Sequence, residues 1–249
     1  VQKKIISFSV KYAKKIFVFT EMNKMDLINK FNCDSSKILL QNLIPFLPEI
    51  YEKNKMVDFK KIFKTKFNLS LNKKYLFYPA QFWEHKNHIL IIEMVKYLKK
   101  NDFNQINILF SGDDKGNYSK IKTMVEKEGL ESYINFLGKI SELELIAIYK
   151  YCDYIIMPTF IGRCSLPLLE GLYFKKIIFY NKDVLDPGLL NYVIGIDPKN
   201  ARELFLKIKK NVIDENNLEI DPKNLIGAYE QLCDKKKFVN NFENLLKNI

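Results

Sequence analysis

Short apolar runs of strand length alternate with longer segments of helical period from Tyr75 to Val212, and this alternation constrains the fold more than any other feature. Repeated strand–helix–strand units are the pattern of a parallel sheet that is covered by helices. The expected strands are Tyr75–Tyr78, Ile106–Phe110, Ile134–Phe136, Asp153–Met157, Lys176–Phe179 and Asn191–Ile194. The expected helices are His88–Lys99, Tyr118–Glu128, Glu142–Tyr151, Pro167–Phe174 and Ala201–Val212.

This order of elements predicts an α/β fold, a Rossmann-like doubly wound parallel sheet with helices on both faces, over residues 73–212. Ligands bind such sheets in the crevice outside the carboxyl ends of the strands. We therefore expect the functional residues in the loops that follow the strands.

The flanking segments carry too little structure to close a core of their own. Residues 1–50 are interpreted as the remnant of a preceding, larger domain, and the Lys-rich residues 51–72 as a connecting helix or linker. Residues 213–249 are expected to form a C-terminal helical extension. The elements expected in residues 1–50 are Ile16–Thr20, Met22–Phe31 and Ile38–Ile44. The apolar residues at helical spacing near the C-terminus are Phe238, Phe242, Leu245 and Leu246.

The composition is basic, with a formal net charge of +11 over 249 residues. Lysine carries almost all of the positive charge, since Arg163 and Arg202 are the only arginines, and the lysines are spread along the whole chain. Reading of nucleic-acid bases usually recruits arginine, so no nucleic-acid partner is expected. Attraction to an anionic membrane surface stays open.

Localisation signals are missing from the sequence. The four cysteines show no C-x-x-C spacing, Val1 to Lys15 show no secretory signal, and no run of about 18 apolar residues occurs. We expect free thiols and a cytoplasmic protein, with peripheral attachment to the inner face of the cell membrane as an option. His85 and His88 lack a set of neighbours with metal-ligand spacing, so no metal is expected, and we interpret the pair as positioning or surface groups.

The most informative stretch is Pro158–Gly171, which follows an expected buried strand and opens a helix. Gly162 gives the loop backbone freedom, and Pro167 suits the first helical position. Such a loop brings free N–H groups and the positive end of a helix dipole to the ligand edge, where a diphosphate would be stabilised. Glu170, about one turn inside, is placed to accept hydrogen bonds from two neighbouring hydroxyls, as on a ribose. The alternative is a first-turn acid that complements the dipole, which is the commoner role in an arbitrary helix.

The second stretch is Tyr78–His88, which also joins a strand to a helix and holds the only Trp and both histidines. Lys86 would lie near the N-terminus of the next helix, where a cation is disfavoured unless an anionic ligand is bound. A phosphate-binding lysine resolves that conflict. The alternative is a solvated surface lysine, the commoner fate of a charged side chain.

Four stretches together resemble, in order and spacing, the group 1 glycosyltransferases, also called glycosyltransferase family 4. The resemblance covers roughly residues 73–210, and residues 13–45 resemble the last part of the family's preceding domain. It implies two facing Rossmann-like halves (the GT-B type), with the donor held by the C-terminal half and the acceptor by the N-terminal half. The stretches are Tyr78–His88, Asn135–Ser141 with Glu144, Leu145 and Tyr149, Tyr154–Pro158, and Ser165–Gly171.

The resemblance also implies the reaction. A sugar would pass from a nucleotide-diphosphate donor, with UDP or GDP as the nucleotide, to a glycan or lipid-linked acceptor, as in the synthesis of cell-envelope polysaccharides. Retention of the anomeric configuration and no metal or other cofactor are expected. Because most of the acceptor domain is not represented in residues 1–50, we expect this chain of 249 residues to bind nucleotide weakly and to transfer little or no sugar.

Site residues follow from the matching positions. Lys86 matches the family's donor-phosphate lysine and Glu170 the acid that holds the nucleotide ribose, so these two are the expected catalytic residues. The backbone near Ile140 matches the nucleobase contact. The amides of the loop Cys164, Ser165 and Leu166 match those that meet the phosphate or the sugar.

Two positions depart from the family pattern. Gly162 stands where a second Glu is common, and Gln81 stands where a phosphate-binding Arg is usual. We hypothesise that Arg163 replaces the missing cation and binds phosphate bidentately, the alternative being an exposed loop arginine. The departures keep a second function open: a non-catalytic nucleotide-binding or scaffolding module derived from a transferase half.

Overall fold

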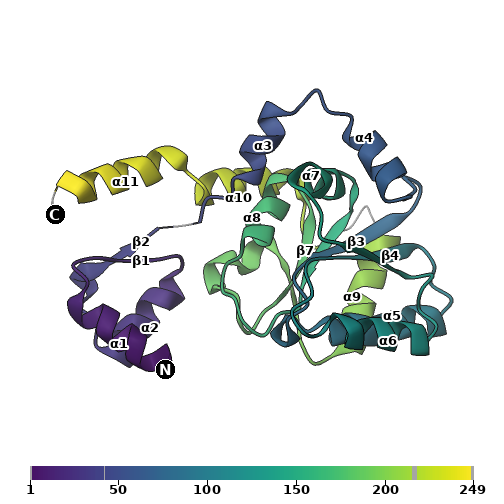
Figure 1. Cartoon of the computed structure of the whole chain (residues 1–249), viewed down its shortest axis with the longest axis horizontal. Coiled ribbons are helices and arrows are strands. Elements are labelled where there is room, and N and C mark those ends of the chain that lie inside the picture. The colour runs from purple at the N-terminus through teal and green to yellow at the C-terminus, as the bar shows by residue number, and fades with distance from the viewer. Residues whose placement is uncertain (1, 42, 215–217, 248–249) are drawn as a thin grey trace.

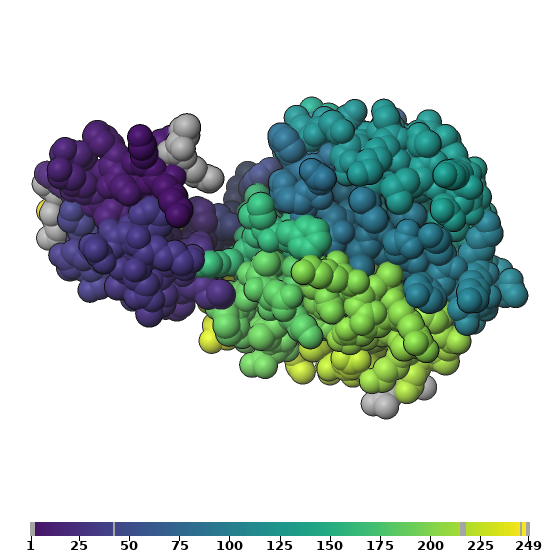
Figure 2. All heavy atoms as spheres, turned by 90° about the horizontal axis from the view of Figure 1, so that it is seen from below, coloured from purple at the N-terminus to yellow at the C-terminus, as the bar shows by residue number. Residues whose placement is uncertain are grey.

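A computed structural model describes residues 2–41, 43–214 and 218–247, without the side chains of Gln2 and Leu245. The chain forms two lobes of unequal size. Figure 2 shows the smaller, N-terminal lobe beside the larger one, with a hollow between them on this face and a narrow region where they meet.

The larger lobe is built on a six-stranded parallel sheet with the order β5-β4-β3-β6-β7-β8, which confirms the predicted doubly wound α/β fold. The strands alternate with helices along the chain, as the apolar pattern predicts. The strands are β3 (Lys74–Pro79), β4 (Ile106–Ser111), β5 (Ile134–Gly138), β6 (Tyr154–Met157), β7 (Ile177–Asn181) and β8 (Ile194–Ile196). The helices are α5 (His88–Lys100), α6 (Tyr118–Lys127), α7 (Glu142–Tyr151), α8 (Leu166–Tyr173) and α9 (Ala201–Ile213).

Helices cover both faces of the sheet (Figure 1). Helices α5, α6 and α9 pack together on one face, while α7 and α8 lie on the other. Apart from the edge strand β5, which is mostly half-buried, the strands between these layers are almost wholly buried, which explains their continuous apolar character. Gly171 lets α8 approach the sheet closely, since a Cβ there would lie 2.7 Å from Ile155 Cδ1.

The edge strand β8 starts later than the predicted Asn191–Ile194. The preceding residues form a 3-10 helix, η4 (Pro187–Tyr192), whose N-cap Asp186 accepts a hydrogen bond from the Gly188 amide at 3.1 Å. An Asp followed by Pro is a strong turn start, and the turn displaces the strand toward the C-terminus.

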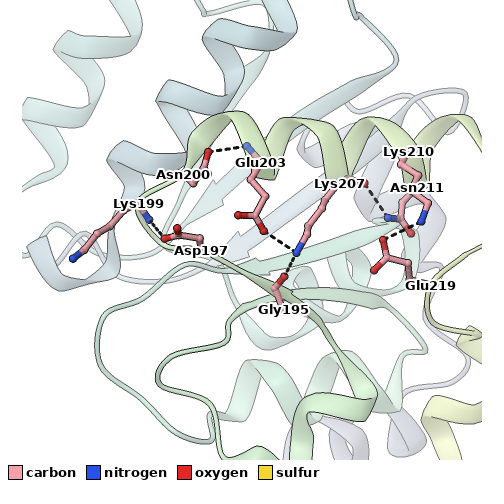
Figure 3. A network of polar contacts seen from close by, with 9 residues as sticks. All are labelled: Gly195, Asp197, Lys199, Asn200, Glu203, Lys207, Lys210, Asn211 and Glu219. Atoms are coloured by element: carbon pink, nitrogen blue, oxygen red, sulfur yellow. Dashed lines mark hydrogen bonds and ion pairs between the residues drawn. The ribbon is translucent and has the colours of Figure 1, made fainter.

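Polar contacts fasten α9 to this edge strand (Figure 3). Lys207 donates to the carbonyl of Gly195 in β8 and pairs with Glu203 at 2.9 Å. Asn200 caps the helix by accepting from the Glu203 amide at 3.0 Å. Helix α9 therefore holds β8 in register as well as covering the sheet.

The N-terminal lobe contains a two-stranded parallel sheet with a small core of its own. Strands β1 (Ile16–Val18) and β2 (Ile38–Leu40) and helix α2 (Glu21–Phe31) were predicted, whereas helix α1 (Gln2–Tyr12) was not. A short 3-10 helix, η1 (Ser35–Lys37), precedes β2. The core residues are Val10, Val18, Cys33 and Ile38.

Residues 47–66 are largely helical and pack on the larger lobe, where the sequence led us to expect a connecting helix or linker over residues 51–72. They form α3 (Leu47–Lys53), α4 (Phe59–Lys61) and the π-helical turn η2 (Ile62–Lys66), all in contact with α7. Phe63 is fully buried, with its ring 5.5 Å from that of Tyr75. Three apolar residues of this segment are buried in the core of the larger lobe: Leu47, Phe59 and Phe63. The many lysines around them gave no indication of this packing.

The C-terminal extension is a pair of helices, of which the first packs on the larger lobe and the second reaches the N-terminal lobe. After a 3-10 turn, η5 (Pro222–Asn224), helix α10 (Leu225–Leu232) packs on α8. Helix α11 (Lys235–Lys247) then crosses to the β1–β2 sheet, where the rings of Phe242 and Phe17 lie 6.1 Å apart (Figure 1). Within the predicted extension, residues 215–217 and 248–249 and the side chain of Leu245 lie outside the described part.

A second close approach that depends on glycine lies at the end of β4. Gly112, directly after β4, has φ +146°, and a Cβ there would lie 2.4 Å from the carbonyl oxygen of Ala80. Gly116 has φ +92° with open space around it. We predict that Gly112→Ala lowers the free energy of unfolding by about 3 kcal/mol, because strain and overlap with backbone add, and that Gly116→Ala lowers it by about 1 kcal/mol. Urea denaturation measures both, and equal losses would contradict the account.

Candidate functional site

The strand order reverses between β3 and β6, and this is where a doubly wound sheet offers its ligand crevice. From β3 the chain proceeds through β4 to the edge strand β5, and from β6 it proceeds through β7 to the opposite edge strand β8. The loops after β3 and β6 therefore leave neighbouring strands at the same edge. These loops are the two stretches that the sequence singled out.

The two loops are hydrogen-bonded to each other. The His85 carbonyl accepts from the Phe160 amide at 2.9 Å and from Thr159 Oγ1 at 3.2 Å. Asn87 Nδ2 donates to the Pro158 carbonyl at 3.2 Å and to the Pro198 carbonyl at 2.9 Å. Lys86 thus belongs to a loop that is fixed against the one leading into α8.

Asn87 is a positioning residue that sequence reasoning missed. It is buried and adopts the left-handed conformation, with φ 58°, at the N-cap of α5. Asn tolerates this conformation better than most residues, and an Asn between a Lys and a helix start was the available signal.

Lys86 is half-buried at the end of a 3-10 turn, η3 (Glu84–Lys86). Its backbone carbonyl accepts a hydrogen bond from Tyr78 Oη at 2.6 Å, which fixes the main chain. Burial lowers the pKa of its ammonium. No carboxylate of the described residues forms an ion pair with it, so its charge lacks a partner within that part of the chain.

The imidazole of His88 is fully buried, which excludes the surface role proposed for it. Its ring lies 4.5 Å from that of Phe82 and nearly parallel to it, and 4.8 Å from that of Tyr78. Burial, together with the charge of Lys86, lowers the pKa of His88 to about 3. A neutral ring therefore packs beneath the loop and supports it.

Gln81 is exposed and turns toward its own loop, where its Oε1 accepts from Trp83 Nε1 at 3.0 Å. Ile140 is half-buried and follows β5 at the same edge of the sheet, two strands away from β3. The structure thus brings Ile140 to the ligand edge, while Gln81 adds no charge there.

The loop after β6 ends in a capped helix start. Gly162 has φ +128°, a conformation that favours glycine. Ser165 is the N-cap of α8, and its Oγ accepts from the Leu168 amide at 3.3 Å. Leu166 is exposed at the first helical position, and burial raises the pKa of the Cys164 thiol to about 11, so that thiol stays protonated.

Glu170 is buried on the α7 side of α8. Its Oε2 accepts a hydrogen bond from the buried Tyr149 hydroxyl at 2.8 Å. Burial raises the pKa of Glu170 to about 7, against the lowering effect of Tyr149. Glu170 lies beyond the first turn of α8, which holds no acidic residue, so the structure disagrees with the alternative of a first-turn acid that complements the dipole.

Arg163 points away from the larger lobe, toward α2. Its Nη2 forms an ion pair with Asp26 Oδ2 at 2.6 Å, and its Nη1 donates to Asn23 Oδ1 at 3.2 Å. The guanidinium is already neutralised, so phosphate binding would require it to leave Asp26. The alternative, an exposed loop arginine, does not fit the structure, because the side chain of Arg163 is only 25% exposed and is paired with Asp26.

The described residues show no disulfide, no metal-binding cluster and no membrane-spanning helix. All four cysteines are free thiols. Among the described residues, no cluster of three His, Cys, Asp or Glu side chains could hold a metal ion. In that same part of the chain, no helix has the length and apolar character needed to span a membrane.

The fold defines an α/β protein whose loops after β3 and β6 are hydrogen-bonded to each other, and comparison with known sequences identifies the family. The sequence profile of the family described as "Glycosyl transferases group 1" matches residues 59–219. This is more than half of the chain, and the protein belongs to the group 1 glycosyltransferases.

Known relatives agree with this assignment. The chain is 23% identical, over 95% of its length and 66% of the relative's, to the capsular polysaccharide biosynthesis glycosyltransferase CapH of Staphylococcus aureus. A glycosyltransferase from Rickettsia africae superposes with a TM-score of 0.77 at 18% identity, over 100% of this chain and 69% of the other. HepE of Anabaena, solved in complex with UDP-glucose, superposes with a TM-score of 0.80 at 12% identity, over 99% and 67%. The chain thus spans about two thirds of the length of these proteins.

The raised pKa of Glu170 predicts a pH-dependent stability. Because the folded pKa is about 7 against an ordinary value of 4.5, the folded protein binds the proton more tightly, and stability falls as pH rises from about 4.5 to 7. We expect Glu170→Gln to remove this loss, so that its free energy of unfolding relative to the wild type rises by about 2 kcal/mol between pH 5 and pH 8. Urea denaturation at both pH values tests this, with the exposed Glu142→Gln as control. A pH-independent difference would contradict it.

Proposed function

We propose that the larger lobe binds a nucleoside diphosphate sugar at the edge formed by the loops after β3 and β6. The observation that carries this proposal is Lys86, a half-buried cation without an ion-pairing carboxylate among the described residues, in a loop bonded to the one that starts α8. A partly desolvated charge without a partner is costly, and a bound anion would compensate it. HepE in complex with UDP-glucose supports a nucleotide sugar as that anion.

The donor diphosphate would meet two sources of positive potential. The ammonium of Lys86 faces it from one loop, and the amides at Cys164 to Leu166 with the N-terminus of α8 face it from the other. These groups would stabilise the negative charge on the departing nucleoside diphosphate. Removing one such contact typically costs about 3 kcal/mol, or about a hundredfold in rate.

Glu170 would hold the ribose in this proposal. The Tyr149 hydroxyl occupies one of its oxygens at 2.8 Å, which orients the carboxylate and leaves the other oxygen for ribose hydroxyls. The ionised form accepts these hydrogen bonds best, so donor binding should weaken as pH falls below about 7.

The sugar would pass to a glycan or lipid-linked acceptor with retention of configuration. CapH, named for capsular polysaccharide biosynthesis, supports an envelope glycan. The N-terminal lobe described here is built on two strands with four buried apolar core residues, against six strands in the larger lobe, so it offers a small scaffold for an acceptor site. We therefore propose that these 249 residues alone bind nucleotide weakly and transfer little sugar.

Calorimetric titration with UDP, GDP and their sugars tests the donor site. We predict that Lys86→Ala lowers the affinity for the preferred nucleotide tenfold or more, because one charged phosphate contact is lost. Lys122→Ala, which removes an exposed lysine on α6, should leave the affinity unchanged. If the wild type binds none of these nucleotides, the result favours the scaffolding module. Gly162 and the uncharged Gln81 are the two residues that support this second function.

Peripheral attachment to the inner face of the cell membrane, in the cytoplasm, is also proposed. Residues 1–20 contain five lysines and no acidic residue. Helix α1 exposes Ile5, Phe8 and Tyr12 on one face, the mixture of apolar and basic groups that binds anionic lipid surfaces.

Vesicle co-sedimentation tests the attachment. We expect binding to vesicles with phosphatidylglycerol, about tenfold weaker binding after Phe8→Ser with Lys4→Ala, and little binding to purely zwitterionic vesicles. Lys122→Ala is the control. Equal binding by the double variant and the wild type would contradict a role for α1.

A further inference from the structure

Helix α2 of the N-terminal lobe is held against the two loops at the carboxyl edge of β6 and β7. The Arg163 guanidinium spans Asp26 at 2.6 Å and Asn23 at 3.2 Å, two side chains one helical turn apart on α2. The planar fork of arginine suits such a two-pronged contact better than a lysine would.

Asp186, in the loop after β7, completes the contact from the other side. Its Oδ2 accepts from the Met22 amide in the first turn of α2 at 3.3 Å, and its Oδ1 accepts from the Gly188 amide at 3.1 Å. Its own amide donates to the Arg163 carbonyl at 3.1 Å. The loop after β6, the loop after β7 and α2 thus form one bonded set, which we call the α2 clasp (Met22, Asn23, Asp26, Arg163 and Asp186).

The position of Arg163 in its loop gives the clasp a consequence for the ligand. Gly162 has φ +128°, a conformation that favours glycine, and a Cβ there would lie in ordinary contact with Tyr180 Oη at 3.8 Å and Thr159 Cγ2 at 3.9 Å. Its carbonyl accepts from Tyr180 Oη at 3.2 Å. Arg163 follows directly and is anchored to α2, and the next three residues are those whose amides would face the donor phosphates.

The charges around Asp26 favour the α2 clasp. Asp26 is paired with Lys30 at 2.8 Å as well as with Arg163, and these cations lower the pKa of its carboxyl, Lys30 most. The side chains of Arg163 and Asp26 are 25% and 34% exposed, so salt weakens their attraction without abolishing it.

We propose that Asp26 is a positioning residue for donor binding: through Arg163 it holds the loop before α8 in the shape that presents the amides at Cys164 to Leu166 to the diphosphate. This rests on the proposed donor site. By linkage, a ligand that prefers the ordered loop also favours the closed contact between the lobes. Arg163 then serves the donor indirectly, through the loop.

The test compares Asp26→Asn, Arg163→Gln and the double variant with the wild type by calorimetric titration with UDP. Each single change should weaken UDP binding about fivefold, and the double variant no more than either single one, because both break one contact. The charge exchange Asp26→Arg with Arg163→Asp re-forms one ion pair but sets a second cation beside Lys30, so it should restore only part of the affinity. Asp34→Asn, an acid that bonds to Ser36 in its own turn, is the matched control.

Amide hydrogen exchange without nucleotide gives a second readout that does not depend on the donor site. Exchange at residues 162–166 should be faster in Asp26→Asn than in the wild type and unchanged in Asp34→Asn. Unchanged exchange in Asp26→Asn, or unchanged UDP affinity alongside a weakened Lys86→Ala, would overturn the clasp. Loss of the proposed donor site alone would appear as UDP affinity unaffected by Lys86→Ala, with faster exchange in Asp26→Asn.

Discussion

The parallel pairing of β3 with β6 is the interaction on which the candidate site depends. Leu76 aligns with Tyr154 and Phe77 with Ile155, so two strands that are far apart in the sequence end side by side. Everything at the ligand edge follows from that register. The loops after these strands meet through the His85 carbonyl, and Gly112 lets the neighbouring loop come within contact of Ala80.

Three ionisable groups near this edge, on Lys86, Arg163 and Glu170, differ in their burial and in their ion pairing. Lys86 keeps its charge without an ion-pairing carboxylate among the described residues, whereas Arg163 is neutralised by Asp26. Glu170 is buried, and its raised pKa makes its charge state sensitive to pH near neutrality. Lys86 therefore has no ion-pairing partner among the described residues, Arg163 links the two lobes through Asp26, and Tyr149 orients the carboxylate of Glu170 by a hydrogen bond.

The sequence predicted the larger lobe well because its apolar runs are long and its helices strongly periodic. The elements from β3 to α9 lie within a few residues of their expected bounds, apart from β8, where Asp186 and Pro187 start a turn. The structure of residues 47–66 and of α1 depends on tertiary packing, which the sequence pattern does not show. Phe59 and Phe63 anchor a Lys-rich segment that looked like a linker, and α1 gains its stability from a small core formed with β1 and α2.

Long-range partners of individual side chains were beyond sequence reasoning. Nothing in the spacing of Arg163 indicates an ion pair with a residue 137 positions earlier in the chain, at Asp26. In the same way, no local pattern links Tyr149 to Glu170 or Asn87 to Pro158. The motif around Lys86 predicted a phosphate-binding lysine. The structure adds that its loop is hydrogen-bonded to the loop after β6 and that Lys86 is half-buried.

A crystal structure of this protein with a bound nucleoside diphosphate sugar tests the central claim most directly. The account predicts a diphosphate within hydrogen-bonding distance of both Lys86 Nζ and the amides at Cys164 to Leu166, with the ribose beside Glu170. A diphosphate bound away from the loops after β3 and β6 would contradict it.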